Sequence, residues 1–373
     1  MKVSKSKNTA EEILSLTGIA INGDHPWDIK VHNERLYQRV FAQGSLGLGE
    51  SYMDGWWDCN KLDEFFYRVL RSQIESKVRH NRALFFRSLL AKGLNMQSKK
   101  RAFQIGEKHY DLGNELFQNM LDKRMVYSCA YWKDSHRLDE AQENKLDLIC
   151  KKLRLQPGMR VLDIGCGWGS FARYAAEKYG AEVTGITVSR EQVEFGKTLC
   201  SKLPVDIRLQ DYRDVNERFD HIVSVGMIEH VGYKYYRTYM EVVRRCLKDD
   251  GLFLLHTIGG NKSVTAVEPW TNKYIFPNGM LPSIKQLGSA IEGLFVMEDW
   301  HNFSADYDKT LMAWHSNIEK YWNKKKSDYD ERFHRMWKYY LLSCAGAFRA
   351  RANQLWQIVL SKEGITGGYK SIR

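Results

Sequence analysis

The sequence predicts an α/β protein built around a doubly wound parallel sheet. Short apolar, β-branched runs alternate with segments of helical period through the middle of the chain, and a glycine-rich turn joins the first run to the helix after it. Strands that are buried on both faces of a parallel sheet have such continuous apolar runs, and the helices between them form the crossovers. Ligands bind such sheets at the carboxyl ends of the strands, so the functional residues are expected there.

The first strand–turn–helix unit is the most informative part of the sequence. An apolar run over residues 159–162 is followed by D-I-G-C-G-W-G over residues 163–169, and a helix is predicted from Phe171. Glycines let the backbone approach a ligand closely while the helix N-terminus faces it. The spacing D-x-G-x-G-x-G is one residue tighter than the G-x-G-x-x-G of dinucleotide binders. Asp163 stands at the expected strand end, where its carboxylate can fix a ligand by a polar contact.

The next predicted elements repeat this alternation. A strand over 181–187 precedes a helix that runs to about Lys202 and opens with Ser189-Arg190-Glu191-Gln192, a sequence typical of a capping box. Three further strands are predicted over 205–209, 221–226 and 252–256. Polar residues stand near the carboxyl ends of the predicted strands: Asp163, Thr187, Asp211, Glu229 and His256.

The length of 373 residues predicts two domains. Residues 1–75 are expected to form a small N-terminal domain, helical or α+β, and 101–373 the main domain; the family resemblance given below implies that the first associates with lipid and that the second is catalytic. Residues 76–100 form a basic linker in which Leu and Phe are interleaved with Lys and Arg. This linker fits two structures equally: a solvated helix with one packed face, or a cationic amphipathic segment that meets lipid headgroups.

The charge balance predicts an anionic partner. Lys and Arg exceed Asp and Glu by 56 − 45 = 11, which suits nucleic acid or an anionic membrane surface. The seven cysteines have irregular spacings that indicate neither a disulfide framework nor a zinc site, so we expect no metal and a reducing cytoplasm. No signal peptide is recognisable, and no apolar stretch approaches the roughly 18 residues of a membrane span.

The order of these elements, with D-I-G-C-G-W-G at its head, resembles the Rossmann-like class I fold of S-adenosylmethionine-dependent methyltransferases. More specific segments resemble the signatures of the cyclopropane-fatty-acyl-phospholipid synthase family. They are residues 44–57, 125–132, 225–232, 256–259 and 344–351. The resemblance extends from about Leu14 to Arg351.

The resemblance implies that the protein transfers a methylene carbon from S-adenosylmethionine to the cis double bond of unsaturated acyl chains in phospholipids. Methylation of an alkene leaves a carbocation, so ring closure needs a base that removes a proton from the added methyl while water is excluded. In the family this base is a bound bicarbonate. By resemblance its ligands are Cys129, Glu229, His256, the backbone around Ile258, and Tyr307. Imidazole, phenol and backbone N–H groups can donate to the anion, and Glu229 can accept from its hydroxyl.

Each candidate also has a structural explanation. Cys129 can be an ordinary buried thiol, His256 a satisfied core histidine, Glu229 a charge at a helix start and Tyr307 the neighbour of a helix cap. Cys344 lies in an apolar predicted helix, and a nucleophilic role is sometimes considered for the family cysteine at this position. Alkene methylation has no step for a covalent thiol, so packing is favoured, while Cys344 stays among the catalytic candidates.

The resemblance also places the cofactor contacts. Tyr127 and Ser128 are expected to close over the sulfonium, and Thr187, Val188 and Gln192 to line the ribose and adenine. The methionine portion and ribose are expected to face Asp163, Gly165, Gly167 and Gly169. Asp211 and Tyr212 are expected to flank the adenine, Tyr212 by stacking. The second strand ends in Thr187 where many relatives have an acidic residue, so Gln192 would have to supply the ribose contact.

The implied partners are a phospholipid membrane surface and unsaturated acyl chains, with homodimerisation and a peripheral, cytoplasmic position on the inner face of the membrane. A nucleic-acid methyltransferase would need a proline–aromatic pair where the chain has Gly226-Met227-Ile228-Glu229, so no nucleic acid is expected. A non-catalytic membrane-binding protein would have lost Asp163, Glu229 or His256, and all three are present. A lipid methyltransferase that does not close the ring remains an alternative.

Overall fold

The computed structural model describes residues 2–73, 113–324 and 329–373, so the predicted linker over 76–100 lies outside the described residues. The chain divides into two compact units. The first comprises residues up to Met120, Val267–Asn278 and Leu311–Ala352, and the second comprises Leu121–Ala266, Gly279–Thr310 and Asn353–Arg373. The grouping of segments beyond residue 260 with the N-terminal residues has no counterpart in the predicted boundaries, which stay a prediction.

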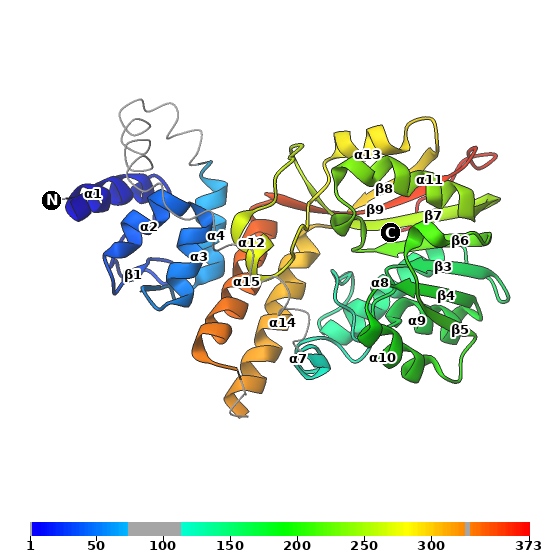
Figure 1. Ribbon diagram of the computed structural model, residues 1–373, viewed down its shortest axis with the longest axis horizontal. Helices are drawn as coiled ribbons and strands as arrows, with labels where there is room; N and C mark the ends of the chain where they lie inside the picture. The colour runs from blue at the N-terminus through cyan, green and yellow to red at the C-terminus, as the bar shows by residue number, and fades with distance from the viewer. Residues whose placement is uncertain (1, 74–112, 325–328) are drawn as a thin grey trace. The chain divides into compact units, whose positions relative to one another are not determined.

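The second unit is built on a seven-stranded sheet (Figure 1). Its strands, in spatial order, are β5 (Val205–Leu209), β4 (Glu182–Thr187), β3 (Arg160–Ile164), β6 (Phe219–Val225), β7 (Leu247–Gly260), β9 (Asn353–Ser361) and β8 (Val296–Asn302). The strands from β5 to β7 are parallel, which confirms the predicted doubly wound sheet. The sequence did not reveal β8 or β9, and β9 runs antiparallel to both of its neighbours.

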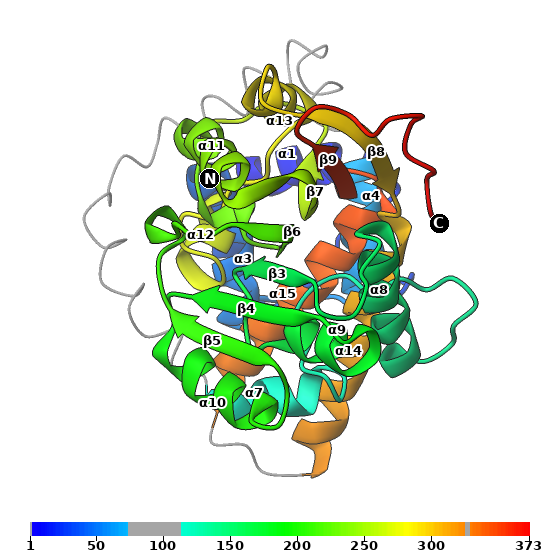
Figure 2. The same ribbon diagram turned by 90° about the vertical axis from the view of Figure 1, so that its right-hand side faces the viewer.

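The two faces of this sheet pack against different helices. Val161, Val223 and Leu254 point to the face covered by α8 (Leu138–Lys152) and α9 (Ser170–Tyr179). Their chain neighbours Leu162, Ile222 and Leu255 point to the other face, where α11 (Tyr236–Cys246) and α13 (Ile284–Ile291) pack (Figure 2). α10 (Arg190–Cys200) contacts β4 and β5. Because side chains alternate along a strand, each buried strand contributes to both cores.

The alternation also sorts the polar residues. Asp163 shares its face with Val161, and Thr187 on β4 has the same parity as Val183, which belongs to the same core cluster as Val161. His256 continues the row of Leu252 and Leu254 on β7. All three candidates therefore project to the side of the sheet that α8 and α9 cover. β7 continues to Gly260, so His256 is not at its own strand's end, but it pairs with Val225, where β6 ends.

The first unit is mainly helical. It contains α1 (Lys2–Ser15), α2 (Arg35–Gln43), α3 (Ser45–Met53), α4 (Leu62–Arg71), α7 (Gly113–Met120), α12 (Pro269–Tyr274), α15 (Glu331–Arg349) and the later part of α14 (Ala305–Lys324). A two-stranded antiparallel sheet joins β1 (Lys30–Val31) to β2 (Trp57–Asp58). Its aromatic core includes Trp57 and Tyr339, whose rings both contact Tyr52.

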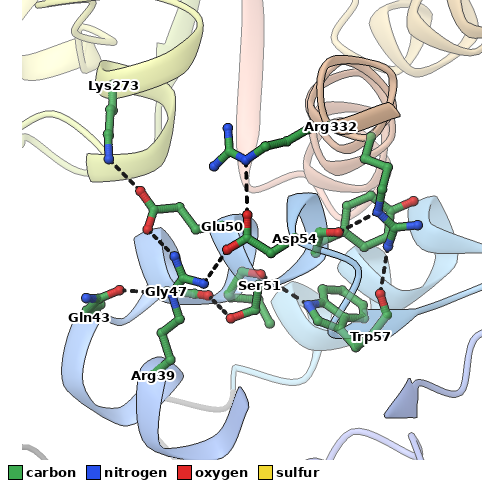
Figure 3. Close-up of polar contacts among 12 residues, drawn as sticks. Arg39, Gln43, Gly47, Glu50, Ser51, Asp54, Trp57, Lys273 and Arg332 are labelled. Carbon is green, nitrogen blue, oxygen red and sulfur yellow. Dashed lines mark hydrogen bonds and ion pairs between the residues drawn. The ribbon is translucent and has the colours of Figure 1, made fainter. Parts of the chain in front are cut away.

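A buried carboxylate on α3 ties distant segments of this unit together (Figure 3). Glu50 accepts hydrogen bonds from Lys273 (2.5 Å) and Tyr274 (2.8 Å) on α12 and from Arg39 (2.5 Å) on α2. Arg39 also pairs with Asp54 at 2.7 Å, and Asp54 accepts from Arg332 on α15 at 3.0 Å. These contacts connect the first 60 residues of the chain to helices more than 200 residues later.

Candidate active site

The glycine turn after β3 has the backbone that its sequence predicts. Gly165, Gly167 and Gly169 all have positive φ, at 80°, 55° and 79°. A Cβ on Gly165 would lie 2.7 Å from Cγ of Met227, whereas a Cβ on Gly167 would meet nothing within 4 Å. Gly165 is therefore required by its backbone conformation and by a packed protein neighbour, and the open side of the turn is at Gly167.

Asp163 is buried inside β3, and its Oδ2 atom has no hydrogen-bond partner among the described residues. Burial raises the pKa of this carboxyl to about 7, although the nearby Lys145 opposes the shift. Lys145, on α8, is itself buried and donates to Ser128 Oγ at 2.9 Å. Burial lowers the pKa of Lys145 to about 8, against the attraction of Asp122. The buried Lys145 thus donates to Ser128 and also acts electrostatically on Asp163 in β3. The half-buried Tyr127 precedes Ser128 in the same loop.

The end of β4 holds the next group of predicted residues. The Thr187 hydroxyl donates to Gln192 Oε1 at 2.7 Å, and the Gln192 backbone N–H donates to Ser189 Oγ at 3.4 Å. The side chain of Gln192 is therefore engaged by Thr187, and only the Ser189 half of the predicted capping box is present. Val188 is 76% exposed, so an apolar side chain stands open beside Thr187.

Asp211 and Tyr212 follow β5 and are both held in place. Asp211 caps a short 3-10 helix, Tyr212–Asp214, and receives the Arg213 guanidinium at 2.9 and 2.7 Å. The hydrogen bonds from Arg213 hold the pKa of Asp211 below its usual value. Tyr212 places its ring 5.1 Å from that of Tyr239 at an angle of 62°.

Glu229 lies on the 3-10 helix Ile228–His230 that follows β6, and it is buried. Its Oε1 accepts the Ile258 backbone N–H at 2.8 Å, and its backbone carbonyl accepts the Met280 N–H at 2.7 Å. Its Oε2 has no partner among the described residues. Burial raises the pKa of Glu229 to about 7, while the Ile258 hydrogen bond opposes the shift. One oxygen is thus anchored to β7 and the other is available to a ligand.

One backbone group of Ile258 is already engaged within the protein. The sequence resemblance directs the backbone around Ile258 toward a bound anion. In the structure, the Ile258 N–H is already used by Glu229. This N–H therefore orients the Glu229 carboxyl group, and a role for the rest of the backbone around Ile258 stays a prediction.

His256 precedes Ile258 by two residues on β7, so the two lie on the same face of the strand. The imidazole is buried, with Nδ1 3.3 Å from Nε2 of Gln357 and with Nε2 unpartnered among the described residues. Burial lowers the pKa of His256 well below its usual value, and the cationic Lys145 and Lys152 lower it further. The ring is therefore neutral at physiological pH.

Cys129 and Tyr307 belong to two segments that hydrogen bonds hold together. The Ala130 N–H donates to Thr310 Oγ1 at 3.1 Å, and the Trp132 N–H donates to Asp306 Oδ2 at 2.8 Å, which fixes the Cys129 loop to the first turns of α14. Tyr307 lies in the first of these turns. Cys129 is buried, and burial raises the pKa of its thiol well above the usual value.

Phe303 connects this pair of segments to β7. Its ring centroid is 5.2 Å from that of Tyr131 and 5.9 Å from that of His256. The loop that carries Cys129, the start of α14 and the strand that carries His256 therefore pack around one aromatic ring.

Cys344 lies on α15, in the first unit, whereas the other candidates all lie in the second. Burial raises the pKa of its thiol to about 12, and the neighbouring Glu268 carboxylate adds to the effect. The thiol is therefore protonated at neutral pH, which suits packing better than nucleophilic attack. All seven cysteines carry free thiols.

Sequence reasoning missed two polar residues of this region, Lys145 and Gln357. On α8, Ala141, Lys145 and Leu148 share the helical face that packs on the sheet, so a lysine in an apolar row was the available signal. Gln357 interrupts the apolar run of β9 in the same way, between Leu355 and Val359. In both cases a polar residue on a buried face indicates that it has a partner inside.

The described parts of the chain contain neither a metal-binding cluster nor a membrane-spanning helix. No group of three or more His, Cys, Asp or Glu side chains there is placed to hold a metal ion. Within the same residues, no helix is both long enough and apolar enough to pass through a membrane.

The chain is similar in sequence to known cyclopropane synthases. The family model for mycolic acid cyclopropane synthetase matches residues 97–358. The cyclopropane-fatty-acyl-phospholipid synthase of Escherichia coli strain K12 is 57% identical over 364 residues, which cover 98% of this chain and 95% of that protein. The probable fatty acid methyltransferase of Pseudomonas putida is 38% identical over 270 residues, 68% of each chain.

Solved structures agree with the sequence matches. The cyclopropane synthase MmaA2 from Mycobacterium tuberculosis has a TM-score of 0.64 and 31% identity, and the match covers 68% of this chain and 96% of that one. The mycolic acid cyclopropane synthase CmaA1 complexed with SAH and CTAB has a TM-score of 0.62 and 33% identity, with the same coverage. The predicted fold and the family resemblance are both confirmed. The chain belongs to the cyclopropane synthase family, whose members are enzymes of the class I S-adenosylmethionine-dependent methyltransferase fold.

Proposed function

We propose that the protein is a cyclopropane-fatty-acyl-phospholipid synthase that uses S-adenosylmethionine and a bound bicarbonate. One observation supports this most directly. Two buried polar atoms near the carboxyl ends of the parallel strands, Glu229 Oε2 and His256 Nε2, have no partner among the described residues. Buried polar atoms are rarely left unpaired, so a small polar ligand that contacts these two atoms would explain both. The 57% identity to the Escherichia coli synthase gives the reaction to be tested.

S-adenosylmethionine fits the glycine turn. The unpartnered Oδ2 of Asp163 can accept a hydrogen bond from the cationic methionine portion, and the open side of Gly167 leaves space for close approach. Lys145 positions the Ser128 hydroxyl, which with Tyr127 is proposed to face the sulfonium. Val188 offers an exposed apolar surface to the adenine, beside the fixed Thr187–Gln192 pair and the anchored Asp211 and Tyr212.

The proposed cradle for bicarbonate consists of Cys129, Glu229, His256, Tyr307 and the backbone around Ile258. His256 Nε2 can donate to an anion, and Glu229 Oε2 can accept from its hydroxyl, so the two unpartnered atoms suit the two ends of this ion. When bound, bicarbonate supplies a base that removes a proton from the methyl group added to the alkene.

The residues of the chain orient this base and exclude water. The Ile258 N–H fixes one oxygen of Glu229, which directs the other. The neutral imidazole of His256 brings no acidic proton that would compete with the base. Cys129 is a buried, protonated thiol, which neither traps a carbocation as a thiolate would nor brings in solvent.

The acceptor is proposed to be a cis-unsaturated acyl chain of a phospholipid. The excess of 11 positive charges supports peripheral binding to an anionic membrane surface, on its cytoplasmic face. Homodimerisation and the absence of a nucleic-acid partner remain parts of this proposal that rest on the family resemblance.

The reaction is tested by incubating the full chain with labelled S-adenosylmethionine and vesicles of cis-monounsaturated phospholipid, followed by NMR and mass analysis of the acyl chains. We expect ring methylene signals. Methyl-branched chains without rings would identify the alternative, a lipid methyltransferase, and the absence of labelled lipid would refute both activities.

Two further arms test the site and the membrane. Glu229→Gln should lower turnover by roughly 10²–10⁴-fold while the affinity for S-adenosylmethionine persists, because an amide presents N–H where the bicarbonate hydroxyl needs an acceptor. Binding to anionic vesicles should weaken as salt is raised, whereas neutral vesicles should show little salt dependence. Equal rates for Glu229→Gln and wild type would remove Glu229 from the mechanism.

A further inference from the structure

Gln357 contacts the imidazole of His256 from the neighbouring strand. In the antiparallel pair of β7 and β9, His256 and Gln357 are direct cross-strand partners, so their side chains lie on the same face. Gln357 is fully buried, and its Nε2 lies 3.3 Å from His256 Nδ1. The contact is thus imposed by the register of the sheet.

This contact has a chemical consequence for the ring. The amide nitrogen of Gln357 faces the ring, while its Oε1 has no partner among the described residues. An amide nitrogen carries only donor hydrogens, so in this arrangement His256 Nδ1 is the acceptor. A neutral imidazole that accepts at Nδ1 carries its single proton on Nε2. Nε2 is the atom without a partner among the described residues, so its N–H is left to donate to a ligand.

The surroundings of His256 make the choice of tautomer decisive. An imidazolium would have N–H groups at both positions, but burial and the charges of Lys145 and Lys152 disfavour that form. With a neutral ring, the tautomer with the proton on Nδ1 would present a lone pair to an anion. Electrostatics alone does not select between the two neutral forms, whereas a directed hydrogen bond does.

The ring on the other side of Gln357 is held separately. His301 on β8 is the cross-strand partner of Gln357 in the second antiparallel pair. Its Nδ1 lies 3.1 Å from the Lys152 ammonium, which pairs with Asp299. Because the Nδ1 atom of His301 contacts Lys152, the side-chain amide of Gln357 is free to donate its hydrogen bond to His256.

We propose that Gln357 is a positioning residue, which holds His256 in the Nε2-protonated neutral tautomer so that the ring donates a hydrogen bond to the anion in the active site. The proposal rests on the proposed function, because that function gives His256 an anion to bind. Gln357 itself does not touch the reacting atoms.

The tautomer is measured by NMR on the full chain labelled with ¹⁵N-histidine, at neutral pH. The His256 signals are assigned by their loss in His256→Ala. In the wild type we expect a neutral ring protonated at Nε2. Gln357→Met, which keeps the side-chain length but has no N–H, should give a mixture of tautomers. Gln357→Glu should move the proton to Nδ1, because a carboxylate accepts from that nitrogen. Nδ1 protonation in the wild type, or an unchanged ring in all variants, would overturn the proposal.

A matched control separates positioning from packing. Gln354 lies on the same strand with the opposite parity and accepts hydrogen bonds from Asn302 and Ser304, at 3.0 and 3.1 Å. Gln354→Met also removes a buried amide, and it should lower thermal stability but leave the His256 tautomer unchanged. If Gln357→Met fails to fold, the pair formed by wild type and Gln357→Glu still decides the question.

Kinetics distinguish this inference from the proposed function. Gln357→Met should lower kcat roughly tenfold, the scale of one hydrogen bond, with KM and S-adenosylmethionine affinity little changed. Full activity in His256→Ala would refute the proposed function while the tautomer result stands. An inactive His256→Ala together with full activity in Gln357→Met would refute the positioning role and keep the function.

Discussion

Glu229 is a residue whose ionisation is opposed by the fold that surrounds it. Burial raises the pKa of its carboxyl to about 7, although hydrogen bonding to the Ile258 N–H and the Thr257 side chain opposes the shift. A carboxylate has to accept the proposed bicarbonate hydroxyl, which means that the active form of the residue is also the less stable one. Stability and activity are therefore expected to oppose each other at this position.

A pH series on Glu229→Gln tests this conflict. Between the usual pKa of 4.5 and the folded value near 7, the native state keeps a proton that the unfolded chain has lost, so wild-type stability falls as the pH rises. A glutamine does not titrate. We expect the free energy of unfolding of the variant, relative to that of the wild type, to increase by on the order of 2 kcal/mol from pH 5 to pH 8. Denaturant unfolding at each pH measures this difference. A difference independent of pH would show that the carboxyl ionises freely.

Cys344 is predicted to be replaceable. Burial raises the pKa of its thiol to about 12, so almost no thiolate exists at neutral pH. Cys344→Ser should keep most of the synthase activity on vesicles and cost at most about 1–2 kcal/mol of stability, because a hydroxyl is buried in place of a thiol. A folded variant without activity would restore the nucleophilic role.

At the scale of elements, the turn between β3 and α9 illustrates how backbone and packing combine. Three glycines with positive φ allow the chain to leave β3 and enter α9 within a few residues. Gly165 is further constrained by Met227, which lies just before the helix that carries Glu229. The glycine turn is thus packed against Met227, which precedes Glu229 by two residues.

Comparison of Gly165→Ala with Gly158→Ala separates the strain of a positive φ from the crowding of Met227. Both glycines have nearly equal φ, +80° and +79°, but a Cβ on Gly158 meets nothing within 4 Å. Gly158→Ala should lose about 1 kcal/mol of stability through strain alone, with unchanged S-adenosylmethionine affinity. Gly165→Ala should lose more stability and much of the affinity by displacing Met227. Equal calorimetric affinities in the two folded variants would exclude that crowding.

At the scale of the whole molecule, each of the two units is assembled from segments that lie far apart in the sequence. The first unit is completed by α12 and α15, which come after most of the sheet of the second unit has been traced. Glu50 illustrates the consequence, because its carboxylate receives two donors from α12 across more than 200 residues. Burial alone would raise its pKa, but the donors Lys273, Tyr274 and Arg39 keep it below the usual value.

Removing this charge should weaken the first unit. Glu50→Gln is expected to cost roughly 2–3 kcal/mol, because Arg39 and Lys273 would keep their charges without a buried counter-ion. The matched control is Glu34→Gln in the exposed Lys7 pair, with an expected change within about 0.5 kcal/mol. The lowered pKa means that the Glu50 contribution persists above pH 4.5 and disappears in stronger acid, which urea unfolding at several pH values can follow.

The sequence predicted what local patterns encode. The glycine turn, the parallel strands and the positions of Asp163 and Glu229 follow from spacing within short windows. β9, Gln357 and the partners of Glu50 do not, since they depend on pairings between segments far apart in the chain. The apolar run of β9 gives no sign of its direction or its neighbours, and Lys145 looks like any helix charge until the helix has a face to bury.

The position of β9 has a consequence for how the enzyme is made. It is the last strand of the sheet along the chain, yet it lies between β7 and β8. Because synthesis proceeds from the N-terminus, both neighbours exist before the strand that separates them, and each then presents an open edge on which other chains can pair. Gln357 lies on β9 and is therefore synthesised after His256 and both neighbouring strands. A nascent polypeptide released before residue 353 would therefore combine an aggregation-prone edge with a His256 imidazole that lacks its contact with Gln357.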